Sequence, residues 1–335
     1  MDGARGVGYA QTMRLSSLLV LVPIALVIAA CSSGGAVDST STTGGGGTAV
    51  STGGAGAMGA GGSDAGTSDG GPIGGDRPVT VYVPSTYDPK TPAPLVITLH
   101  GYGASGVIEE LYVNIKAEAS KRGFLYAYPD GTLDASSQRF WNATDACCNF
   151  GGSKVDDSAY LSGVIADIQA RFSVDPKRIY LFGHSNGGFM AYRMACEHAD
   201  QIAAIASLAG AMFNDETQCA PSGPVSVLQI HGTADAVIAY NGGANAGNVY
   251  PSAQTSVEDW AALDGCSLTA DTSSPPIDLE AVLPGAETTV RVYGAGCKTG
   301  GHAELWTVEG GAHIPALSST FTSRVVDFLY AHPKP

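Results

Sequence analysis

Beyond residue 75 the chain alternates short apolar runs with segments of helical spacing, and this alternation limits its fold more than any other feature. Several apolar runs are continuous, which is typical of strands covered on both faces of a sheet. The predicted strands are Val79–Val83, Leu95–Leu99, Phe124–Tyr128, Arg178–Phe182, Ile202–Leu208, Val225–Ile230, Thr289–Tyr293 and Glu304–Val308. The predicted helices are Ile108–Arg122, Asp157–Phe172, Gly187–His198, Ala253–Leu263 and Thr320–Ala331. We therefore predict an α/β protein with a mostly parallel sheet of about eight strands and helices on both faces.

Ser185 stands between two glycines in Gly183-His184-Ser185-Asn186-Gly187, which fits the pattern G-x-S-x-G. A predicted strand ends directly before it and a predicted helix begins directly after it. That strand–turn–helix setting is the one a nucleophile elbow requires. The glycines allow the close backbone approach of a sharp turn. We therefore predict that Ser185 is a nucleophile, with a plain glycine turn as the alternative.

A serine nucleophile needs a base, and that base needs an orienting acid. Asp235 follows the predicted strand Val225–Ile230, and His313 follows the strand Glu304–Val308. In parallel sheets, reactive groups collect at the carboxyl ends of the strands. Asp235 and His313 are therefore the predicted acid and base. The rival acids Asp264 and Asp271 lie in a longer, loop-rich region.

A second loop offers backbone donors for an oxyanion. His100-Gly101-Tyr102-Gly103 follows the strand Leu95–Leu99, where an enzyme with this elbow carries its other oxyanion donor. We predict that the N–H groups of Tyr102 and Asn186 form the oxyanion hole. The Tyr102 side chain either lines the site or packs over its own loop.

The amino-terminal thirty residues have the pattern of an export signal. Arg14 precedes a short apolar run that ends in Ile28-Ala29-Ala30-Cys31. Those four residues resemble the bacterial lipobox, which implies cleavage before Cys31 and lipidation of its thiol. An ordinary signal peptide with an incidental cysteine is the alternative. With a lipid anchor, the protein is expected at the cell surface or outer membrane; without one, it is expected to be secreted.

Residues 31–75 are rich in Gly, Ser, Thr and Ala and carry no Lys or Arg. Such a segment buries too little apolar surface to offset its ordering entropy, so we predict a disordered tether. Residues 1–30 form the predicted signal peptide and 76–335 one catalytic domain. The net charge of −14 argues against nucleic acid as a partner. Membrane contact is expected only through the lipid, and the protein is expected to be a monomer.

With Cys31 set aside as the lipid carrier, six cysteines remain in the predicted domain. An even number in an exported domain predicts disulfides. The cysteines are Cys147, Cys148, Cys196, Cys219, Cys266 and Cys297. The pair Cys266–Cys297 is favoured because both residues lie on loops in the last third of the chain. A metal cluster is disfavoured, since no C-x-x-C pair stands near spaced histidines. We expect neither a metal nor a cofactor.

Seven segments together resemble the secreted polyhydroxybutyrate depolymerase and feruloyl esterase group of the α/β-hydrolases. The segments are LHGYGASG, YPDGT, FWNATDACC, VDDSAYL, GHSNGGFMAYRMACE, IHGTAD and GGAHIP. The resemblance implies an α/β-hydrolase fold and a Ser185-Asp235-His313 triad, with Tyr102 and Asn186 at the oxyanion positions. The chain departs from the group at Ala312 and Ile314, where the group often has glycine and an aromatic residue. These departures bear on the shape of the pocket.

Two aromatic residues are candidates for the substrate pocket. Trp141, in the loop after Phe124–Tyr128, either forms a wall for an acyl group or fastens its loop to the body. Tyr240, soon after Asp235, is a weaker candidate of the same kind.

The expected activity is hydrolysis of extracellular carboxylic esters by a serine acyl-enzyme mechanism. Feruloyl or acetyl polysaccharides and hydroxyalkanoate polyesters or oligomers are the expected substrates. A non-catalytic binding module on the same fold and a peptidase are the alternatives. The triad order argues against the first, and the missing propeller-type domain argues against the second.

Overall fold

The computed structural model describes residues 63–65, 67–68 and 71–335. The predicted signal peptide, Cys31 and most of the predicted tether lie outside the described residues. Ile73 is buried in the core, and the Gly74 N–H donates to Asp167 Oδ2 over 3.0 Å. Packing of the body therefore begins before residue 76.

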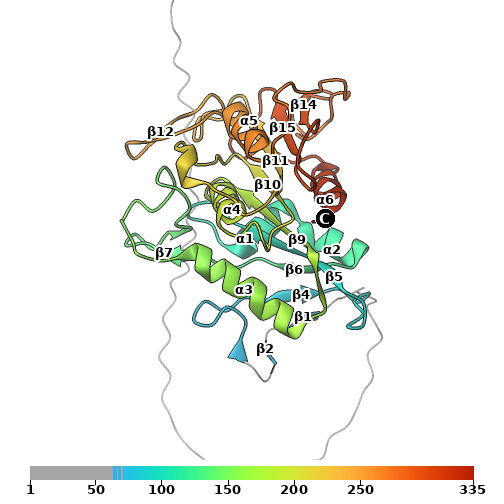
Figure 1. Ribbon diagram of the computed structural model, residues 1–335. Helices are drawn as coiled ribbons and strands as arrows, with labels where there is room; N and C mark the ends of the chain where they lie inside the picture. Colours follow the sequence, from blue (N-terminus) through green and yellow to red (C-terminus); the bar gives the residue numbers. More distant parts are fainter. Residues whose placement is uncertain (1–62, 66, 69–70) are drawn as a thin grey trace, which may run out of the picture. The chain divides into compact units, whose positions relative to one another are not determined.

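A nine-stranded, mostly parallel sheet forms the centre of the fold, with the strand order β1-β4-β6-β5-β9-β10-β11-β15-β14 (Figure 1). The outer pairs β1–β4, β4–β6 and β14–β15 are antiparallel, and the pairs between β6 and β15 are parallel. In chain order the sheet strands are β1 (Ser63–Ala65), β4 (Val81–Val83), β5 (Ala93–Leu99), β6 (Leu125–Ala127), β9 (Val174–His184), β10 (Ala204–Leu208), β11 (Ser226–Gly232), β14 (Thr288–Tyr293) and β15 (Ala303–Val308). The predicted sheet is confirmed, and the short strand β1 adds a ninth member.

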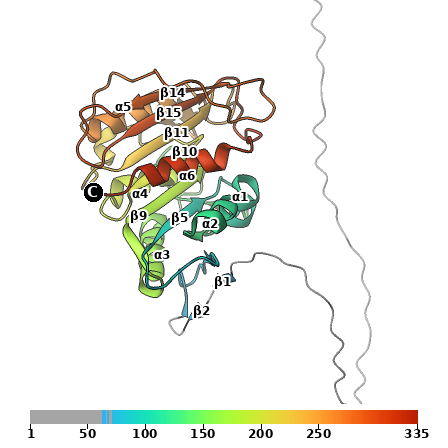
Figure 2. The same ribbon diagram turned by 90° about the vertical axis from the view of Figure 1, so that its right-hand side faces the viewer.

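Helices cover both faces of this sheet, as Figures 1 and 2 show. They are α1 (Gly106–Val113), α2 (Ile115–Arg122), α3 (Asp157–Arg171), α4 (Asn186–Glu197), α5 (Ala253–Leu263) and α6 (Phe321–Ala331). Leu95 and Ile97 of β5 pack in the cluster that holds α3 and α4, whereas Val96 packs in the cluster that holds α2 and α6. Both faces of β5 are thus buried, which explains its continuous apolar sequence.

Three short two-stranded ribbons lie outside the main sheet. They pair β2 (Thr67–Ser68) with β3 (Gly71–Pro72), β7 (Thr132–Leu133) with β8 (Arg139–Phe140), and β12 (Gly243–Asn245) with β13 (Asn248–Tyr250). A 3₁₀ turn, η1, covers Glu216–Gln218. The second and third ribbons occur in loops that leave the carboxyl ends of the sheet strands.

One predicted helix is divided in the structure. Ile108–Arg122 forms α1 and α2, separated by Asn114 with φ of 53°. Asparagine is among the few non-glycine residues that adopt this left-handed conformation at low cost. The prediction of one continuous helix was therefore wrong, because helical spacing on both sides of Asn114 concealed the turn.

Three disulfides join the six cysteines of the predicted domain: Cys147–Cys148, Cys196–Cys219 and Cys266–Cys297. The favoured pair is among them. Cys266 follows α5 and Cys297 follows β14, so this bond ties a helix to the edge of the sheet. No helix in the described part of the chain is long and apolar enough to cross a bilayer.

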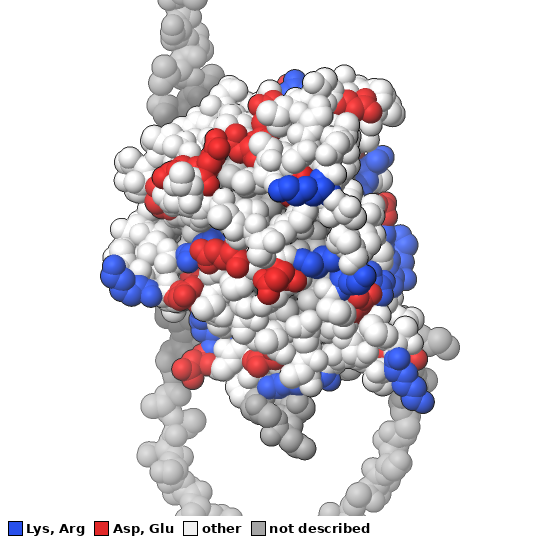
Figure 3. Space-filling view, in the orientation of Figure 1, with Lys and Arg blue, Asp and Glu red and all other residues white. Residues whose placement is uncertain are grey.

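The face in Figure 3 carries acidic and basic side chains that lie close to one another. On α4, Arg193 Nε is 2.9 Å from Glu197 Oε1, one turn further along the helix. Ion pairs four residues apart on a helix typically contribute about 0.3–0.5 kcal/mol each to stability.

Candidate active site

Ser185 occupies a strained turn between β9 and α4. Its φ is 54° and its ψ is −119°, which places a non-glycine residue at positive φ. A Cβ at Gly183 would lie 2.0 Å from the carbonyl oxygen of Gly187, and one at Gly187 would lie 2.0 Å from that of Leu99. The turn therefore admits only glycine at both positions. Strain of this kind persists where the surrounding structure imposes it, and functional sites are a common place for it.

Three loops bring Ser185, His313 and Asp235 together at the carboxyl edge of the sheet. His313 Nε2 lies 2.9 Å from Ser185 Oγ, and His313 Nδ1 lies 2.7 Å from Asp235 Oδ2. Ser185 follows β9, Asp235 follows β11 and His313 follows β15. These contacts have the order that the predicted triad of nucleophile, base and orienting acid requires.

Asp235 is held as a carboxylate by several donors. Its Oδ1 accepts the N–H groups of Val237 and Ile238 over 2.8 and 2.9 Å, and His231 Nε2 lies 3.3 Å from Oδ2. Burial on its own raises the pKa of Asp235, but the hydrogen bonds from His231 and His313 outweigh it and hold that pKa well below its ordinary value. The ionised carboxylate fixes the His313 tautomer with hydrogen on Nδ1, which leaves Nε2 free to accept the serine proton.

The segments that carry the two predicted oxyanion donors both lie next to Ser185. A Cβ at Gly101 would lie 3.4 Å from Ser185 Cβ, so the loop that carries Tyr102 runs against the serine. Asn186 is the first residue of α4, where a backbone N–H has no acceptor within the helix. His100 Nδ1 contacts the Gly101 carbonyl over 2.8 Å, and Nε2 accepts the Gly131 N–H over 2.9 Å, which fixes the loop.

Trp141 does not line a pocket. Its side chain is fully buried, and its indole N–H donates to the His100 carbonyl over 3.1 Å. The Trp141 N–H donates to Asn186 Oδ1 over 2.7 Å, and Asn186 Nδ2 donates to the Trp141 carbonyl over 2.9 Å. The predicted acyl wall is therefore wrong. Trp141 fastens its loop to the two segments that carry the predicted oxyanion donors.

Tyr240 is half-buried beside the acid loop. Its hydroxyl shares a hydrogen bond with Thr307 Oγ1 over 2.8 Å, and its ring meets that of His231 edge to face with centroids 5.8 Å apart. These contacts give the Tyr240 side chain a packing role behind Asp235.

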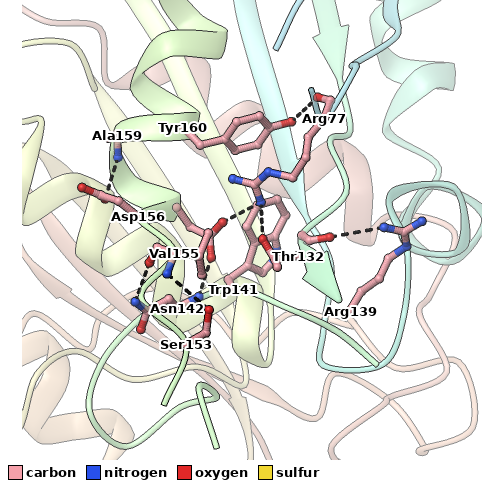
Figure 4. Close-up of polar contacts among 12 residues, drawn as sticks. Arg77, Thr132, Arg139, Trp141, Asn142, Ser153, Val155, Asp156, Ala159 and Tyr160 are labelled. Carbon is pink, nitrogen blue, oxygen red and sulfur yellow. Dashed lines mark hydrogen bonds and ion pairs between the residues drawn. The ribbon is translucent and has the colours of Figure 1, made fainter. Parts of the chain in front are cut away.

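The loop between β6 and α3 is fastened at its base by a buried carboxylate (Figure 4). Asp157 Oδ1 lies 2.6 Å from Arg77 Nη1, and Asp157 Oδ2 accepts the Asn142 N–H over 2.7 Å. Arg77 also donates to Thr132 Oγ1 over 3.0 Å. Asp156 caps α3 by accepting the Ala159 N–H over 3.0 Å. The backbone at Trp141 and at its neighbour Asn142 is thus held by Asn186 and by Asp157.

The sequence analysis did not predict a buried pair, Glu109 and His184. This pair joins the loop that contains Gly101 to the loop that carries His313. Glu109 of α1 and His184 are both buried, with Glu109 Oε2 3.6 Å from His184 Nδ1 and 3.4 Å from the Gly101 N–H nitrogen. His184 Nε2 donates to the His313 carbonyl over 3.0 Å. Burial lowers the pKa of His184, but the hydrogen bond and charge of Glu109 outweigh it and raise that pKa overall. A glutamate on a helix gives no sequence signal for this contact.

The rival acids lie elsewhere. Asp264 is fully buried at the end of α5, where the Lys298 N–H donates to its carbonyl, and Asp271 pairs with Val292 of β14. Across the described residues, no group of three His, Cys, Asp or Glu side chains has the arrangement of a metal site.

The solved structures agree with this description of the fold. An acetyl xylan esterase from Aspergillus awamori superposes with a TM-score of 0.55 and 16% identity, covering 80% of this chain and all of that one. The fold is that of the α/β-hydrolases.

Residues 71–262 match the family described as Putative esterase, and the chain belongs to that family. It is 31% identical over 245 residues to feruloyl esterase B of Piromyces equi, a match that covers 71% of this chain and 42% of the relative. It is 29% identical to the bifunctional acetylxylan esterase/xylanase XynS20E of Neocallimastix patriciarum, covering 50% of this chain and 22% of the relative. The chain thus spans less than half the length of these two relatives.

Proposed function

We propose that the protein hydrolyses carboxylic esters through a serine acyl-enzyme, with Ser185, His313 and Asp235 as the triad. The observation that carries the proposal is the hydrogen-bond sequence from Ser185 through His313 to Asp235, with neighbouring distances of 2.9 and 2.7 Å. Membership of the esterase family supports it independently.

In the proposed acylation step, Ser185 Oγ attacks the ester carbonyl carbon and its proton passes to His313 Nε2. Asp235 stabilises the imidazolium that forms, and the N–H groups of Tyr102 and Asn186 donate to the oxyanion. The tetrahedral intermediate collapses, His313 gives the proton to the leaving alcohol, and an acyl ester remains on Ser185.

Water completes the cycle. His313 Nε2 takes a proton from the water as the water oxygen attacks the acyl carbonyl carbon. As the second tetrahedral intermediate collapses, His313 returns this proton to Ser185 Oγ and the carboxylic acid is released. No cofactor enters any step.

The proposed substrates are extracellular esters, since the relatives are named for feruloyl and acetylxylan ester hydrolysis. Hydroxyalkanoate esters stay a prediction from the sequence resemblance alone. Three disulfides are typical of exported proteins. The lipid anchor at Cys31 also stays a prediction.

The test is hydrolysis of p-nitrophenyl acetate, methyl ferulate, acetylated xylan and hydroxybutyrate oligomers by the wild-type protein and by Ser185→Ala. We expect at least one ester to be hydrolysed, with a loss of about 10³-fold or more in the variant. A wild-type protein inert to all four esters would favour a non-catalytic binding module. Cleavage of a peptide in preference to its ester analogue would favour a peptidase.

A further inference from the structure

Two aromatic side chains are exposed in the described part of the chain, and they touch each other. Tyr102 is 38% exposed and Phe150 is 49% exposed, whereas the other described Phe, Tyr and Trp side chains are buried or half-buried. Their ring centroids lie 5.3 Å apart, with planes at 64°. Exposed apolar side chains that touch one another form a contiguous patch, and such patches are typical of binding sites.

The pair lies beside the proposed oxyanion hole. Tyr102 carries one proposed donor on its own backbone, and its neighbour Gly101 lies against Ser185. Phe150 belongs to the loop that the backbone of Trp141 fastens to Asn186, the second proposed donor. One ring is therefore carried by the loop of a proposed oxyanion donor, and the other by a loop that is hydrogen-bonded to the side chain of the second donor residue.

The Tyr102 ring is held in place before any ligand binds. Its hydroxyl donates to Asp134 Oδ2 over 2.5 Å. Asp134 Oδ1 in turn accepts the N–H groups of Ser136 and Gln138 over 2.8 and 2.9 Å. A ring fixed in this way loses little rotamer entropy when a ligand stacks on it.

The mechanism decides which part of an ester faces the pair. His313 Nε2 must reach the oxygen of the leaving alcohol in order to protonate it, so the alcohol lies on the His313 side of Ser185. The acyl group then extends to the other side. The apolar neighbour on the alcohol side is Ile314, which is 65% exposed. The rings of Tyr102 and Phe150 come from the loop that carries one predicted oxyanion donor and from the loop that is bonded to the other, and not from the loop that carries His313.

We propose that Tyr102 and Phe150 form an aromatic shelf that stacks the aryl ring of an aromatic acyl group, such as a hydroxycinnamoyl ester. The proposal rests on the ester hydrolysis proposed above and names the acyl class that the same site prefers. Offset and edge-to-face aromatic contacts are worth about a tenfold gain in binding. The shelf thus makes the protein favour aryl acyl esters over acetyl esters.

Two esters with the same leaving group test the shelf: p-nitrophenyl ferulate and p-nitrophenyl acetate. The quantity measured is the ratio of their kcat/KM values. We expect Phe150→Ala to lower this ratio about tenfold, because the acetyl ester has no ring to lose. Asp134→Asn, which weakens the hold on the Tyr102 hydroxyl, is expected to lower the ratio about threefold.

Leu133→Ala is the matched control, since Leu133 is an exposed apolar residue on the same loop. The control is expected to leave the ratio within twofold of the wild-type value. A fall of threefold or more in Phe150→Ala, absent from the control, supports the shelf. A smaller change, or an equal loss for both esters, would overturn it, the equal loss placing the pair on the alcohol side. Wild-type protein inert to both esters would instead contradict the proposed hydrolysis itself.

Discussion

At the scale of single residues, the candidate site depends on how each reactive group is held by its neighbours. Asp235 receives two backbone N–H groups and two imidazoles, so the proposed base keeps one tautomer. His184 lies directly before the serine and contacts the carbonyl of His313, so a residue outside the proposed triad positions one within it. The charge of Glu109 raises the pKa of His184 and favours its role as a double donor.

Replacing Glu109 by glutamine tests this positioning pair. We expect kcat for p-nitrophenyl acetate to fall about tenfold with KM within twofold, because the change alters the alignment of His313 and leaves the substrate surface intact. Steady-state kinetics measure both parameters. Glu110→Gln is the matched control, since Glu110 is the next residue on α1 and accepts the Lys116 N–H instead. An equal fall of kcat in Glu109→Gln and Glu110→Gln would contradict a positioning role for Glu109.

The sequence could predict the residues of the proposed triad because each follows a strand and their chain order is restrictive. It could not place Trp141, because the burial of an aromatic ring depends on what the fold packs around it. The Glu109–His184 contact could not be predicted from the sequence for a similar reason. The two residues lie on different elements, and only the packing of α1 against the sheet brings them together.

At the scale of elements, the loop-rich region after α5 is fastened by the Cys266–Cys297 disulfide. The bond closes a segment with a sequence separation of 31 residues. That segment contains β14, an edge strand that pairs with the sheet on one side only. The sequence predicted this bond from loop position, whereas the turn at Asn114 went unpredicted because one residue at positive φ leaves helical spacing almost unchanged.

The double variant Cys266→Ser/Cys297→Ser is expected to lower the free energy of unfolding by about 3–4 kcal/mol. A disulfide that closes a loop of this length lowers the entropy of the unfolded chain, and this loss corresponds to about that free energy at 25 °C. Urea denaturation of the oxidised proteins measures the difference. A loss below about 1 kcal/mol would contradict the expected contribution. Reduction of the variant with dithiothreitol reports what the remaining disulfides add.

At the scale of the whole molecule, the stability of the domain should depend on a buried carboxyl group far from the proposed chemistry. Asp264 is fully buried, and this burial raises its pKa to about 7 from an ordinary value of 3.8. The unfolded chain therefore loses this proton at lower pH than the folded protein does. As pH rises from about 4 to 7, the group progressively destabilises the fold, and above 7 the penalty is constant.

Asp264→Asn removes that titration. We expect the gain in stability relative to wild type to be about 2–3 kcal/mol larger at pH 8 than at pH 5. Thermal melts at the two pH values measure this difference as a change in Tm. Asp271→Asn, at an exposed position, is the control and should show the same offset at both pH values. A difference in stability between Asp264→Asn and the wild type that is the same at both pH values would contradict the raised pKa of Asp264.

The central claim is that Ser185 is a nucleophile activated by His313, and covalent labelling tests it most directly. A fluorophosphonate probe requires an activated serine, so we expect one adduct on the wild-type protein, mapped by peptide mass spectrometry to Ser185. Ser185→Ala is expected to carry none, and His313→Ala to react at least 10³-fold more slowly. An adduct on another serine, or undiminished labelling of Ser185→Ala, would contradict the account.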